Sequence, residues 1–586
     1  MTKSQDLVHL LTPEGEALRS TPAVAPWHVY PRPQMKRDSF VCLNGVWELS
    51  VNGGAWERVL VPFPPESLLS GLCRDMGDDP TLVYRRTFPR PTGSEGGRVL
   101  LHFGAVDQRA SVTLNGHSVG SHEGGYEAFT LDITEAIRDE NLLEVTVTDH
   151  LSSHVLPYGK QRRDRGGMWY TPVTGIWQTV WLECVPETYV KSLRIDTTRD
   201  TATITAEGVT EGTVTVTITA EGVTEGTVTI ATPEGALVVP LSGGKATATI
   251  PAPRLWSPDD PYLYTFTVEA GEDTVTSYFA LRTLEIRAIS GVPRLCLNGK
   301  PCFLHALLDQ GYWSDGIYTP ATPDSYEKDI LAMKALGFNT LRKHIKIEPE
   351  QFYYDCDRLG MLVMQDMVNN GDYSFLRDTA LPTVGLKSLN DKRLHRDKAT
   401  RAAFFAGMES TVRRLRNHPC IVYWTIFNEG WGQFDSATAY ERLKALDDTR
   451  FIDTASGWFK GAPSDVDSEH VYFKPVKLRY SHRPMVLSEF GGYSFKPEGH
   501  VFNPVNTYGY RFFKDRGAFE DALVTLYETE IIPSVAKGLC GAVYTQVSDV
   551  EDETNGLLSY DRRVLKVDEG RMRAIAAALE AAITQS

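Results

Sequence analysis

Eight short apolar runs in the C-terminal half of the chain alternate with amphipathic stretches, and this alternation restricts the fold more than any other sequence feature. In residues 324–336, for example, Tyr326, Ile330 and Met333 fall on one face of a helix. The apolar runs lie at 302–307, 339–342, 361–367, 421–427, 451–455, 470–473, 485–487 and 541–545. Strands and helices that alternate in this number predict a (β/α)8 TIM barrel, which we place at residues 285–586.

Residues 1–188 have a different pattern. They carry short runs in which apolar and polar residues alternate, such as 99–103 and 142–147, with turn signals such as Asn115-Gly116 between them. Alternating runs at this spacing are typical of antiparallel strands. The pattern predicts a β-sandwich in this first section.

Residues 189–284 are rich in Thr, Val and Gly and contain a tandem duplication. The stretch ITAEGVTEGTVTV at 204–216 recurs as ITAEGVTEGTVTI at 218–230. Two copies are too few for a solenoid. Each copy fits one or two strands joined by a Glu-Gly turn, so we expect a second, enlarged β-sandwich and assign the repeat no function of its own.

Composition excludes several classes of protein. The 586 residues carry a net charge of −15 and a pI of about 5.5, whereas nucleic-acid binders usually present a basic surface. No run of about 18 apolar residues occurs, so we expect no membrane span. Residues 1–11 lack the apolar core and cleavage site of a secretory signal, which favours a cytoplasmic location. The eight cysteines form no CxxC pair and are expected to be reduced, mostly buried thiols.

Polar residues that follow the predicted strands are the place to look for chemistry, because active sites of such barrels lie at the C-terminal strand ends. Glu429 follows the fourth run, Glu489 follows the seventh, and Arg342 ends the second. Two carboxylates at strand ends can face each other across the barrel mouth. Glycoside cleavage needs such a pair, one to protonate the departing oxygen and one to attack the anomeric carbon or activate water.

Motifs in all three sections resemble glycoside hydrolase family 2, which includes β-galactosidases, β-glucuronidases and β-mannosidases. The matching stretches are GMWYTPVTGIWQTVWLE at 167–183, LWSP at 255–258, YFALR at 278–282, LNGKP at 297–301, NHP at 417–419, Asn428-Glu429 and SEFG at 488–491. They follow the family's order over nearly the whole chain. The resemblance implies a sugar-binding jelly roll at residues 1–188, an immunoglobulin-like sandwich at 189–284 and a catalytic barrel at 285–586.

The resemblance also implies roles for individual residues. Glu429 aligns with the family's acid/base and Glu489 with its nucleophile, which implies an exo-acting, retaining β-glycosidase that works by double displacement. Asn428 would hydrogen-bond the sugar 2-hydroxyl, and Arg342 would hold the charge and orientation of the nucleophile. A nearby cation keeps a carboxylate ionised, as a nucleophile requires.

Three further residues are predicted to contact substrate. His344 lies just after Arg342, and it either contacts substrate or is a structural histidine with satisfied hydrogen bonds. Trp431 and Tyr493 follow the two catalytic motifs, and aromatic rings stack on the apolar C–H faces of sugars. For each aromatic residue the alternative is a place in the protein core.

Other acidic residues at strand ends have more than one interpretation. Asp309 follows the first predicted strand and either contacts sugar or braces its loop, and Asp366 ends the third. The acidic stretch at 549–553 follows the eighth strand. This acidic cluster either contacts sugar hydroxyls or a cation, or it forms a solvated loop; we expect the solvated loop.

The identity of the sugar is the point that the sequence constrains least. β-Glucuronidases of family 2 carry an Asn-x-Lys triplet after the nucleophile strand, whereas a match here, Asn390-Asp-Lys392, precedes the fourth strand. We therefore expect a neutral sugar, with a β-galactoside as first choice. A β-glucuronide or β-galacturonide is the alternative, since Arg or Lys from another loop can bind a carboxylate. A carbohydrate-binding protein without activity and a transglycosidase also remain open.

Cofactors and partners follow from the same chemistry. Retaining glycosidase chemistry requires no redox cofactor. Some members of family 2 bind magnesium, and the motifs here assign no ligands to a divalent cation. We expect a carbohydrate or glycoside as partner, and neither nucleic acid nor membrane; whether the chain forms a homo-oligomer is left open.

Overall fold

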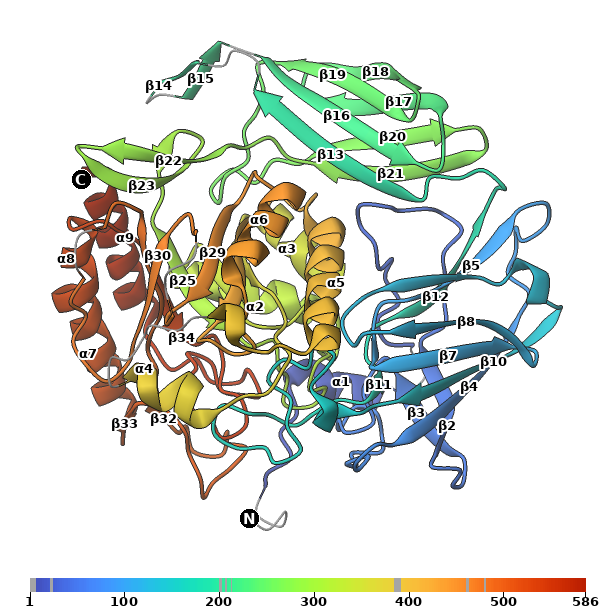
Figure 1. The fold of residues 1–586 in the computed structure, drawn as a ribbon, viewed down its shortest axis with the longest axis horizontal. Helices are drawn as coiled ribbons and strands as arrows, with labels where there is room; N and C mark the ends of the chain where they lie inside the picture. The colour runs from blue at the N-terminus through green and yellow to red at the C-terminus, as the bar shows by residue number, and fades with distance from the viewer. Residues whose placement is uncertain are drawn as a thin grey trace.

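The computed structural model describes residues 7–21, 25–199, 203–205, 208–211, 213–383, 391–459, 463–478 and 481–585. Two antiparallel β-structures flank a parallel barrel: in Figure 1 the N-terminal one lies to the right of the barrel and the second one above it. The chain thus combines two β-rich domains with a (β/α)8 barrel. This confirms the predicted fold class.

Eight parallel strands form the barrel in the order β29-β28-β27-β26-β25-β34-β31-β30. The strands are β25 (Leu304–Asp309), β26 (Thr340–Lys343), β27 (Leu362–Asp366), β28 (Ile421–Asn428), β29 (Phe451–Ser456), β30 (Asp467–Val471), β31 (Met485–Gly491) and β34 (Leu539–Thr545). Each corresponds to one predicted run, with ends shifted by a few residues. Nearly every strand residue is buried, because both faces of the sheet are covered.

Helices surround the barrel and turn their apolar faces inward. They are α2 (Asp324–Ala335), α3 (Glu350–Leu359), α4 (Leu381–Thr383), α5 (Lys398–Leu415), α6 (Ser436–Leu446), α7 (Arg516–Leu526), α8 (Ile532–Val535) and α9 (Glu569–Gln585), and the short α1 (Pro13–Ser20) lies near the N-terminus. In α5, Asp397 caps the first turn by accepting a hydrogen bond from Thr400 N, and Phe404 and Met408 are buried. Burial of each such side chain stabilises the fold by about 1.5–3 kcal/mol.

Side chains close the barrel between β29 and β30, the two ends of the strand order. Ser468 Oγ on β30 donates to Asp453 Oδ1 on β29 at 3.0 Å. Farther along the same pair of strands, His470 Nε2 lies 3.1 Å from Ser456 Oγ. These polar contacts take the place of a backbone ladder and bring His470 to the mouth of the barrel.

The N-terminal sandwich consists of a six-stranded sheet, β3-β2-β4-β10-β7-β8, and a four-stranded sheet, β1-β12-β5-β9. Its strands are β1 (Val41–Cys42), β2 (Gly45–Val51), β3 (Glu57–Val61), β4 (Thr81–Pro89), β5 (Arg98–Phe103), β6 (Val106–Asp107), β7 (Arg109–Leu114), β8 (His117–Glu123), β9 (Phe129–Asp132), β10 (Glu140–Thr148), β11 (Gly175–Ile176) and β12 (Val180–Val185). Trp47, Leu101 and Val145 are part of its apolar core. Between β10 and β11, the chain leaves the sandwich and contacts the barrel.

The second β-domain is a seven-stranded sheet in the order β13-β16-β19-β18-β17-β20-β21. Its strands are β13 (Ser192–Arg199), β16 (Thr213–Glu221), β17 (Glu225–Thr232), β18 (Gly235–Ser242), β19 (Lys245–Pro251), β20 (Tyr264–Ala270) and β21 (Asp273–Phe279); β14 (Thr203–Thr205) pairs with β15 (Gly208–Glu211). Strands β16 and β17 carry the TVTV and TVTI segments of the duplication and pair with different neighbours. Residues 206, 207 and 212 of the first copy lie outside the described residues.

The second domain also supports the base of the barrel. Arg282 donates to Pro419 O at 2.6 Å and to Ile421 O, at the start of β28, at 2.7 Å. Trp256 Nε1 donates to Asp357 O at 2.7 Å. Strands β22 (Leu284–Ile289), β23 (Val292–Leu297) and β24 (Lys300–Pro301) then lead into the barrel. The strand that delivers Glu429 is therefore anchored from outside.

Two expectations from composition can be compared with the fold. All eight cysteines are free thiols, four of them buried and only Cys73 exposed. Within the described part of the chain, no helix combines the length and the apolarity that a membrane span requires.

Candidate active site

The two predicted catalytic carboxylates meet at the mouth of the barrel. Glu429 follows β28 in a left-handed backbone conformation (φ 52°), and Gly430 continues the turn at φ 78°. A side chain at Gly430 would meet the ring of Phe459 at 2.4 Å, so the turn requires glycine. Glu489 lies on β31. One oxygen of each carboxylate and one ring nitrogen of His470 all lie within 4.8 Å of one another.

Arg342 on β26 is fully buried and donates hydrogen bonds to four other residues of the site. Its Nη1 donates to Glu489 Oε1 at 3.0 Å and to Ser488 O at 2.8 Å. Its Nη2 donates to Asn428 Oδ1 at 2.9 Å, and its Nε donates to Asp366 Oδ1 at 3.0 Å. One guanidinium group therefore positions three side chains from three different strands.

The surroundings of Glu489 hold it in the ionised form. Burial alone would raise the pKa of its carboxyl group, but the charges of His470 and Arg342 lower that pKa to about 2. Tyr472 Oη also donates to Glu489 Oε2. Burial raises the pKa of Tyr472 well above its usual range, so its hydroxyl remains a donor. Glu489 is thus an oriented anion at neutral pH.

A chain of hydrogen bonds determines how His470 faces Glu429. Ser488 Oγ donates to Glu469 O at 3.4 Å, and Ser456 Oγ donates to Ser488 Oγ at 3.0 Å. The Ser456 hydroxyl therefore accepts from Nε2–H of His470, 3.1 Å away. The other ring nitrogen, Nδ1, lies 2.7 Å from Glu429 Oε1. Ser456 thus orients the imidazole ring so that Nδ1 faces Glu429.

Asp366 joins Arg342 to His344, whose Nδ1 lies 2.8 Å from Asp366 Oδ2. Burial and then the charge of Lys160 lower the pKa of His344 to about 4. Neutral His344 donates from Nδ1 to Asp366. Its Nε2 makes no hydrogen bond within the described part of the chain, so this lone pair is available to a ligand.

The two predicted aromatic residues lie in different surroundings. Trp431 is buried and stacks on Trp169 of the N-terminal domain, with ring centroids 5.0 Å apart. The edge of Tyr373 meets Trp431 at 5.4 Å. Tyr493 packs against Phe513 at 5.5 Å. The guanidinium group of Arg511 lies 5.4 Å from the centroid of the Tyr493 ring.

Several residues of the site were not predicted from the sequence. His470 and Tyr472 lie two positions apart on the sixth strand and its extension, and both face the carboxylates. The signal was present, because this run was predicted as a strand and carries polar residues near its end. Lys160, from the N-terminal domain, gave no such signal.

The expectation of a solvated acidic loop after the eighth strand is wrong. Glu551 and Glu553 are only 3% and 4% exposed. Glu553 Oε2 accepts hydrogen bonds from Tyr170 Oη and from Gln546 Nε2, both at 2.8 Å. The loop is buried because the segment that leaves the N-terminal sandwich covers it, a contact between distant parts of the sequence.

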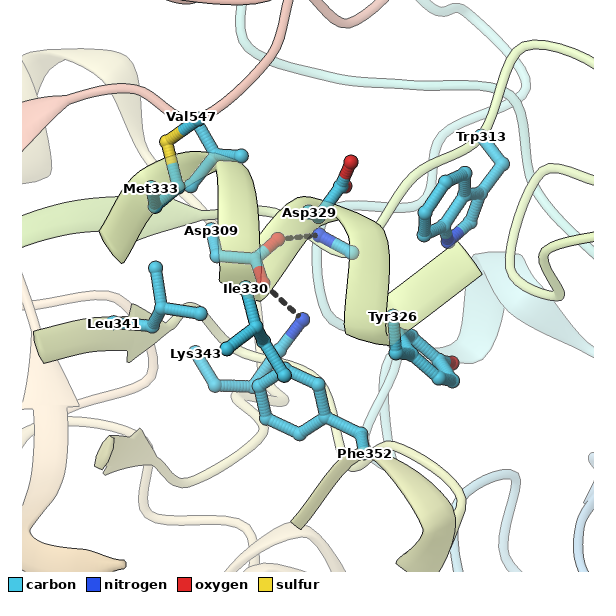
Figure 2. Close-up of a pocket in the computed structure, with 11 residues that line it drawn as sticks. Asp309, Trp313, Tyr326, Asp329, Ile330, Met333, Leu341, Lys343, Phe352 and Val547 are labelled. Carbon is cyan, nitrogen blue, oxygen red and sulfur yellow. Dashed lines mark hydrogen bonds and ion pairs between the residues drawn. The ribbon is translucent and has the colours of Figure 1, made fainter. Parts of the chain in front are cut away.

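Asp309 braces its loop. Its carboxylate accepts from Lys343 Nζ at 2.6 Å and from Gly311 N at 2.9 Å. Figure 2 shows Asp309 and Lys343 at a small pocket between the barrel strands and α2, lined otherwise by Gly311, Trp313, Tyr326, Asp329, Ile330, Met333, Leu341, Phe352 and Val547. Asp309 pairs with Lys343, and Asp329 pairs with Arg562 at 3.3 Å, so each charged residue that lines the pocket already has a partner.

The donors at the carboxylate pair do not suit magnesium. Glu429, His470 and Glu489 place two oxygens and one nitrogen within 4.8 Å of one another. Magnesium prefers octahedral oxygen ligands, several of them water. His470 already pairs with Glu429, and Glu489 already accepts from Arg342 and Tyr472. The residues are arranged for proton chemistry.

Family models match each part of this architecture. The model described as "Glycosyl hydrolases family 2, TIM barrel domain" matches residues 294–510, "Glycosyl hydrolases family 2" matches residues 188–282, and "Glycosyl hydrolase 2 galactose-binding domain-like" matches residues 74–168. The three matches follow one another in the order of the domains described above.

Individual relatives point the same way. A β-galactosidase of Thermoanaerobacter pseudethanolicus is 28% identical over 374 residues, which cover 60% of this chain and 45% of that protein. A β-glucuronidase of Felis catus is 25% identical over 398 residues, 62% of this chain and 56% of that protein. The chain thus spans about half the length of these two curated relatives.

The fold also matches solved structures. The β-D-glucuronidase of Dictyoglomus thermophilum superposes with a TM-score of 0.73 over 94% of this chain and 98% of that one, at 16% sequence identity. At that identity the likeness concerns the fold alone. Together with the three family models, in the order that the motifs predict, it leads to one assignment: the chain belongs to glycoside hydrolase family 2.

Proposed function

We propose that the protein is an exo-acting, retaining β-glycosidase that hydrolyses terminal β-linked sugars by double displacement. The observation that carries the proposal is the approach of the two carboxylates, whose nearest oxygens lie within 4.8 Å. Retaining glycosidases hold their two carboxyl groups about 5–5.5 Å apart, whereas inverting enzymes leave about 6.5–9.5 Å for a water molecule. The short separation supports retention.

In the first step, Glu489 attacks the anomeric carbon while Glu429 protonates the glycosidic oxygen. The bond between a Glu489 oxygen and C1 forms, the bond from C1 to the aglycone oxygen breaks, and the aglycone leaves as a neutral alcohol. Arg342 and Tyr472 hold the attacking carboxylate by hydrogen bonds. His470 holds Glu429, whose proton goes to the leaving oxygen.

In the second step, water replaces the aglycone. Glu429, now ionised, removes a proton from this water, whose oxygen attacks C1. The bond between C1 and Glu489 breaks, and the free carboxylate returns to Arg342. Glu429 ends the cycle protonated beside His470. Two displacements at C1 leave the product in the β configuration.

Asn428 has the orientation that a contact to the sugar 2-hydroxyl requires. Its Oδ1 accepts from Arg342 Nη2 at 2.9 Å, so the amide NH2 is the end left to donate to substrate. A hydrogen bond to the 2-hydroxyl that strengthens in the transition state accelerates the reaction. This supports Asn428 as the contact to the glycone beside the reacting carbon.

For the glycone we propose a neutral sugar, with a β-galactoside first. Glu551, Asp552 and Glu553 lie together beside the site, and Arg165 pairs with the first two at 3.3 Å and 3.7 Å. A uronate would bring a further negative charge to this buried acidic cluster and would be repelled. The competing glucuronide and galacturonide specificities are supported by one observation, the unpaired cation Lys160.

A panel of aryl β-glycosides tests the proposal, with galactoside, glucoside, mannoside, glucuronide and galacturonide compared under one set of conditions. We expect turnover of the galactoside with a β product by NMR, and covalent labelling of Glu489 by a 2-deoxy-2-fluoro glycoside. The Glu489→Gln variant should lose on the order of 10⁴-fold or more of kcat. An inverted product, or no turnover across the panel, would refute the proposal and favour a carbohydrate-binding protein.

A further inference from the structure

A lysine from the N-terminal domain reaches the barrel mouth without a bonding partner. Lys160 lies between β10 and β11 and is 7% exposed. Its Nζ lies 5.2 Å from the ring centroid of Trp431 and 5.8 Å from that of Tyr170. Among the described residues, this ammonium group makes no hydrogen bond and no ion pair. A buried cation without partners is costly, so its natural partner is a ligand.

The backbone around Lys160 is held firmly. Tyr170 N donates to Lys160 O at 3.0 Å and Arg162 N donates to Tyr170 O at 3.0 Å, which ties the two ends of the segment together. The neighbouring Gln161 donates to Asp107 Oδ2 at 2.9 Å and accepts from Val173 N at 2.7 Å. Lys160 is therefore presented from a fixed position, which lowers the entropy lost when it binds a ligand.

Glu553 supplies a free acceptor close to this free donor. Both of its hydrogen bonds, from Tyr170 Oη and from Gln546 Nε2, go to Oε2. Its Oε1 accepts no hydrogen bond from any described residue. Tyr170 links the two groups, because Lys160 Nζ lies over its ring while its hydroxyl holds Glu553. Among the described residues, Lys160 and Glu553 form no ion pair with each other, and Tyr170 is the side chain that both contact.

The charge of Lys160 reaches the catalytic residues as well. It lowers the pKa of Glu489, after the larger effects of burial, His470, Arg342 and His344. Burial raises the pKa of Glu553, and Lys160 is the strongest influence that opposes the rise. The geometry agrees with these effects, because Lys160 Nζ lies near the rings of Trp431, two residues after Glu429, and of Tyr170, which holds Glu553.

We propose that Lys160 and Glu553 together bind hydroxyl groups of the glycone, with Lys160 Nζ donating and Glu553 Oε1 accepting. The inference rests on the proposed glycosidase function and names the group that selects its substrate. A sugar hydroxyl both accepts and donates, so one hydroxyl or two neighbouring ones satisfy this pair. A uronate carboxylate only accepts: it would satisfy Lys160 but bring a like charge to Glu553. The pair therefore selects neutral sugars.

Monodeoxy substrates test the proposal. Aryl β-galactoside and its 3-, 4- and 6-deoxy analogues are compared on the wild type, Lys160→Met and Glu553→Gln. We expect Lys160→Met to lower kcat/KM for the parent substrate by about 10- to 100-fold, as for a hydrogen bond to a charged group. For the analogue that lacks the recognised hydroxyl, the same substitution should cost less than about threefold, because the interaction is already absent. Lys245→Met, on the exposed face of β19, is the matched control.

Three results would overturn the inference. An equal loss for all analogues would mean that Lys160 acts only through the charge of Glu489. Unchanged kcat/KM in Lys160→Met would remove its role altogether. A wild type that prefers the aryl β-glucuronide, with that preference lost in Lys160→Met, would make Lys160 a carboxylate-binding group instead.

Failure of the lysine proposal and failure of the glycosidase proposal can be told apart. Labelling of wild-type Glu489 by the fluoro sugar reports the glycosidase function without reference to Lys160. Binding of galactose and its deoxy analogues to Glu489→Gln, with and without Lys160→Met, reports the hydroxyl contact by calorimetry without turnover. Thermal unfolding supplies the last check: a lysine that lacks protein partners should not lower Tm when it becomes methionine, whereas a structural lysine should.

Discussion

His470 Nδ1 lies 2.7 Å from Glu429 Oε1, at the seam where β30 meets β29. The same nitrogen lies 3.6 Å from Glu489 Oε2, so one imidazole ring faces both carboxylates. Ser456 accepts from the other ring nitrogen and fixes which nitrogen carries the hydrogen. The acid and the nucleophile are thus joined through a histidine that closes the barrel.

Replacement of His470 by Phe should weaken acid catalysis more than nucleophilic attack. Without Nδ1, the proton-bearing oxygen of Glu429 loses its partner and its orientation. General acid catalysis contributes about 10²–10⁴-fold, so we expect kcat/KM for alkyl glycosides, which need protonation, to fall by about 100-fold. The dinitrophenolate group leaves without protonation, so kcat/KM for dinitrophenyl glycosides should fall far less. The measurement is a series of leaving groups of graded acidity.

Ser456→Ala is the control for that experiment, since it removes the hydroxyl partner of Nε2 and keeps the imidazole. Ser456→Ala should also lower kcat/KM more for alkyl glycosides than for dinitrophenyl glycosides, but by a smaller factor than His470→Phe. Equal losses for good and poor leaving groups in His470→Phe would contradict the role in acid catalysis and indicate a general loss of structure.

Arg342→Met should move the acid limb of the pH profile. Arg342 helps to lower the pKa of Glu489 to about 2, so the nucleophile of the wild type is ionised at all but very low pH. Removal of an opposite charge a few ångströms away raises a carboxyl pKa by about 1–3 units. The acid limb of kcat/KM should therefore shift to higher pH by that amount. Arg342→Lys retains the charge and should shift it less.

The lowered pKa of Glu489 also makes the stability of the fold depend on pH. The folded-state pKa of Glu489 lies below its ordinary value of 4.5, so its ionisation contributes stability above pH 4.5 that is lost as pH falls towards 2. Arg342→Met reduces this contribution and leaves two buried carboxylates less well paired, which costs about 3–5 kcal/mol. Urea unfolding at several pH values measures both effects. An unchanged free energy of unfolding at neutral pH would show that Arg342 does not hold the site together.

The barrel and its carboxylates were predictable because their signals are local. Eight apolar runs marked the strands, and Glu429 and Glu489 follow two of them directly. His470 was within reach of the same argument. A polar residue in a strand is ambiguous, however, until its neighbours are known, and Ser456 comes from another strand.

Contacts between domains were not predictable in this way. Lys160 and Tyr170 lie in a loop without periodicity, and their positions depend on how the sandwich docks against the barrel. The burial of Glu553 follows from the same docking, since Tyr170 is one of its two partners. Local composition predicts that this loop is exposed to solvent, because it contains no information about Tyr170, which lies far away in the sequence.

Tyr493→Phe should have little effect on catalysis, in contrast to the prediction of a substrate contact from its sequence position. Its ring packs against Phe513, and the guanidinium group of Arg511 lies near it. We expect kcat/KM within about twofold of the wild type, as for a substitution that removes no structural contact. The comparison is Trp431→Phe, which replaces the indole ring that stacks on Trp169 and lies near Lys160 by a smaller ring. This substitution should lower kcat/KM more. A loss of over tenfold in Tyr493→Phe would restore the sequence-based role.

Gly430→Ala should disturb both stability and activity, because this glycine turns the chain directly after Glu429. At φ 78° an alanine costs about 1–2 kcal/mol through backbone strain alone. Its Cβ would also meet the Phe459 ring at 2.4 Å, which must move the turn that carries Glu429. Gly271→Ala is the matched control, since φ is 63° there and a Cβ would meet nothing within 4 Å. It should show the strain cost in urea unfolding and keep full kcat.

The Phe459 contact can then be tested by itself. If the ring displaces the turn, Phe459→Ala in the Gly430→Ala background should recover part of the lost kcat, because the clash is gone while the backbone strain remains. The coupling between the two substitutions in a double-mutant cycle measures that part. Equal losses of stability in Gly430→Ala and Gly271→Ala, with kcat unchanged in both, would mean that the position of Glu429 does not depend on this turn.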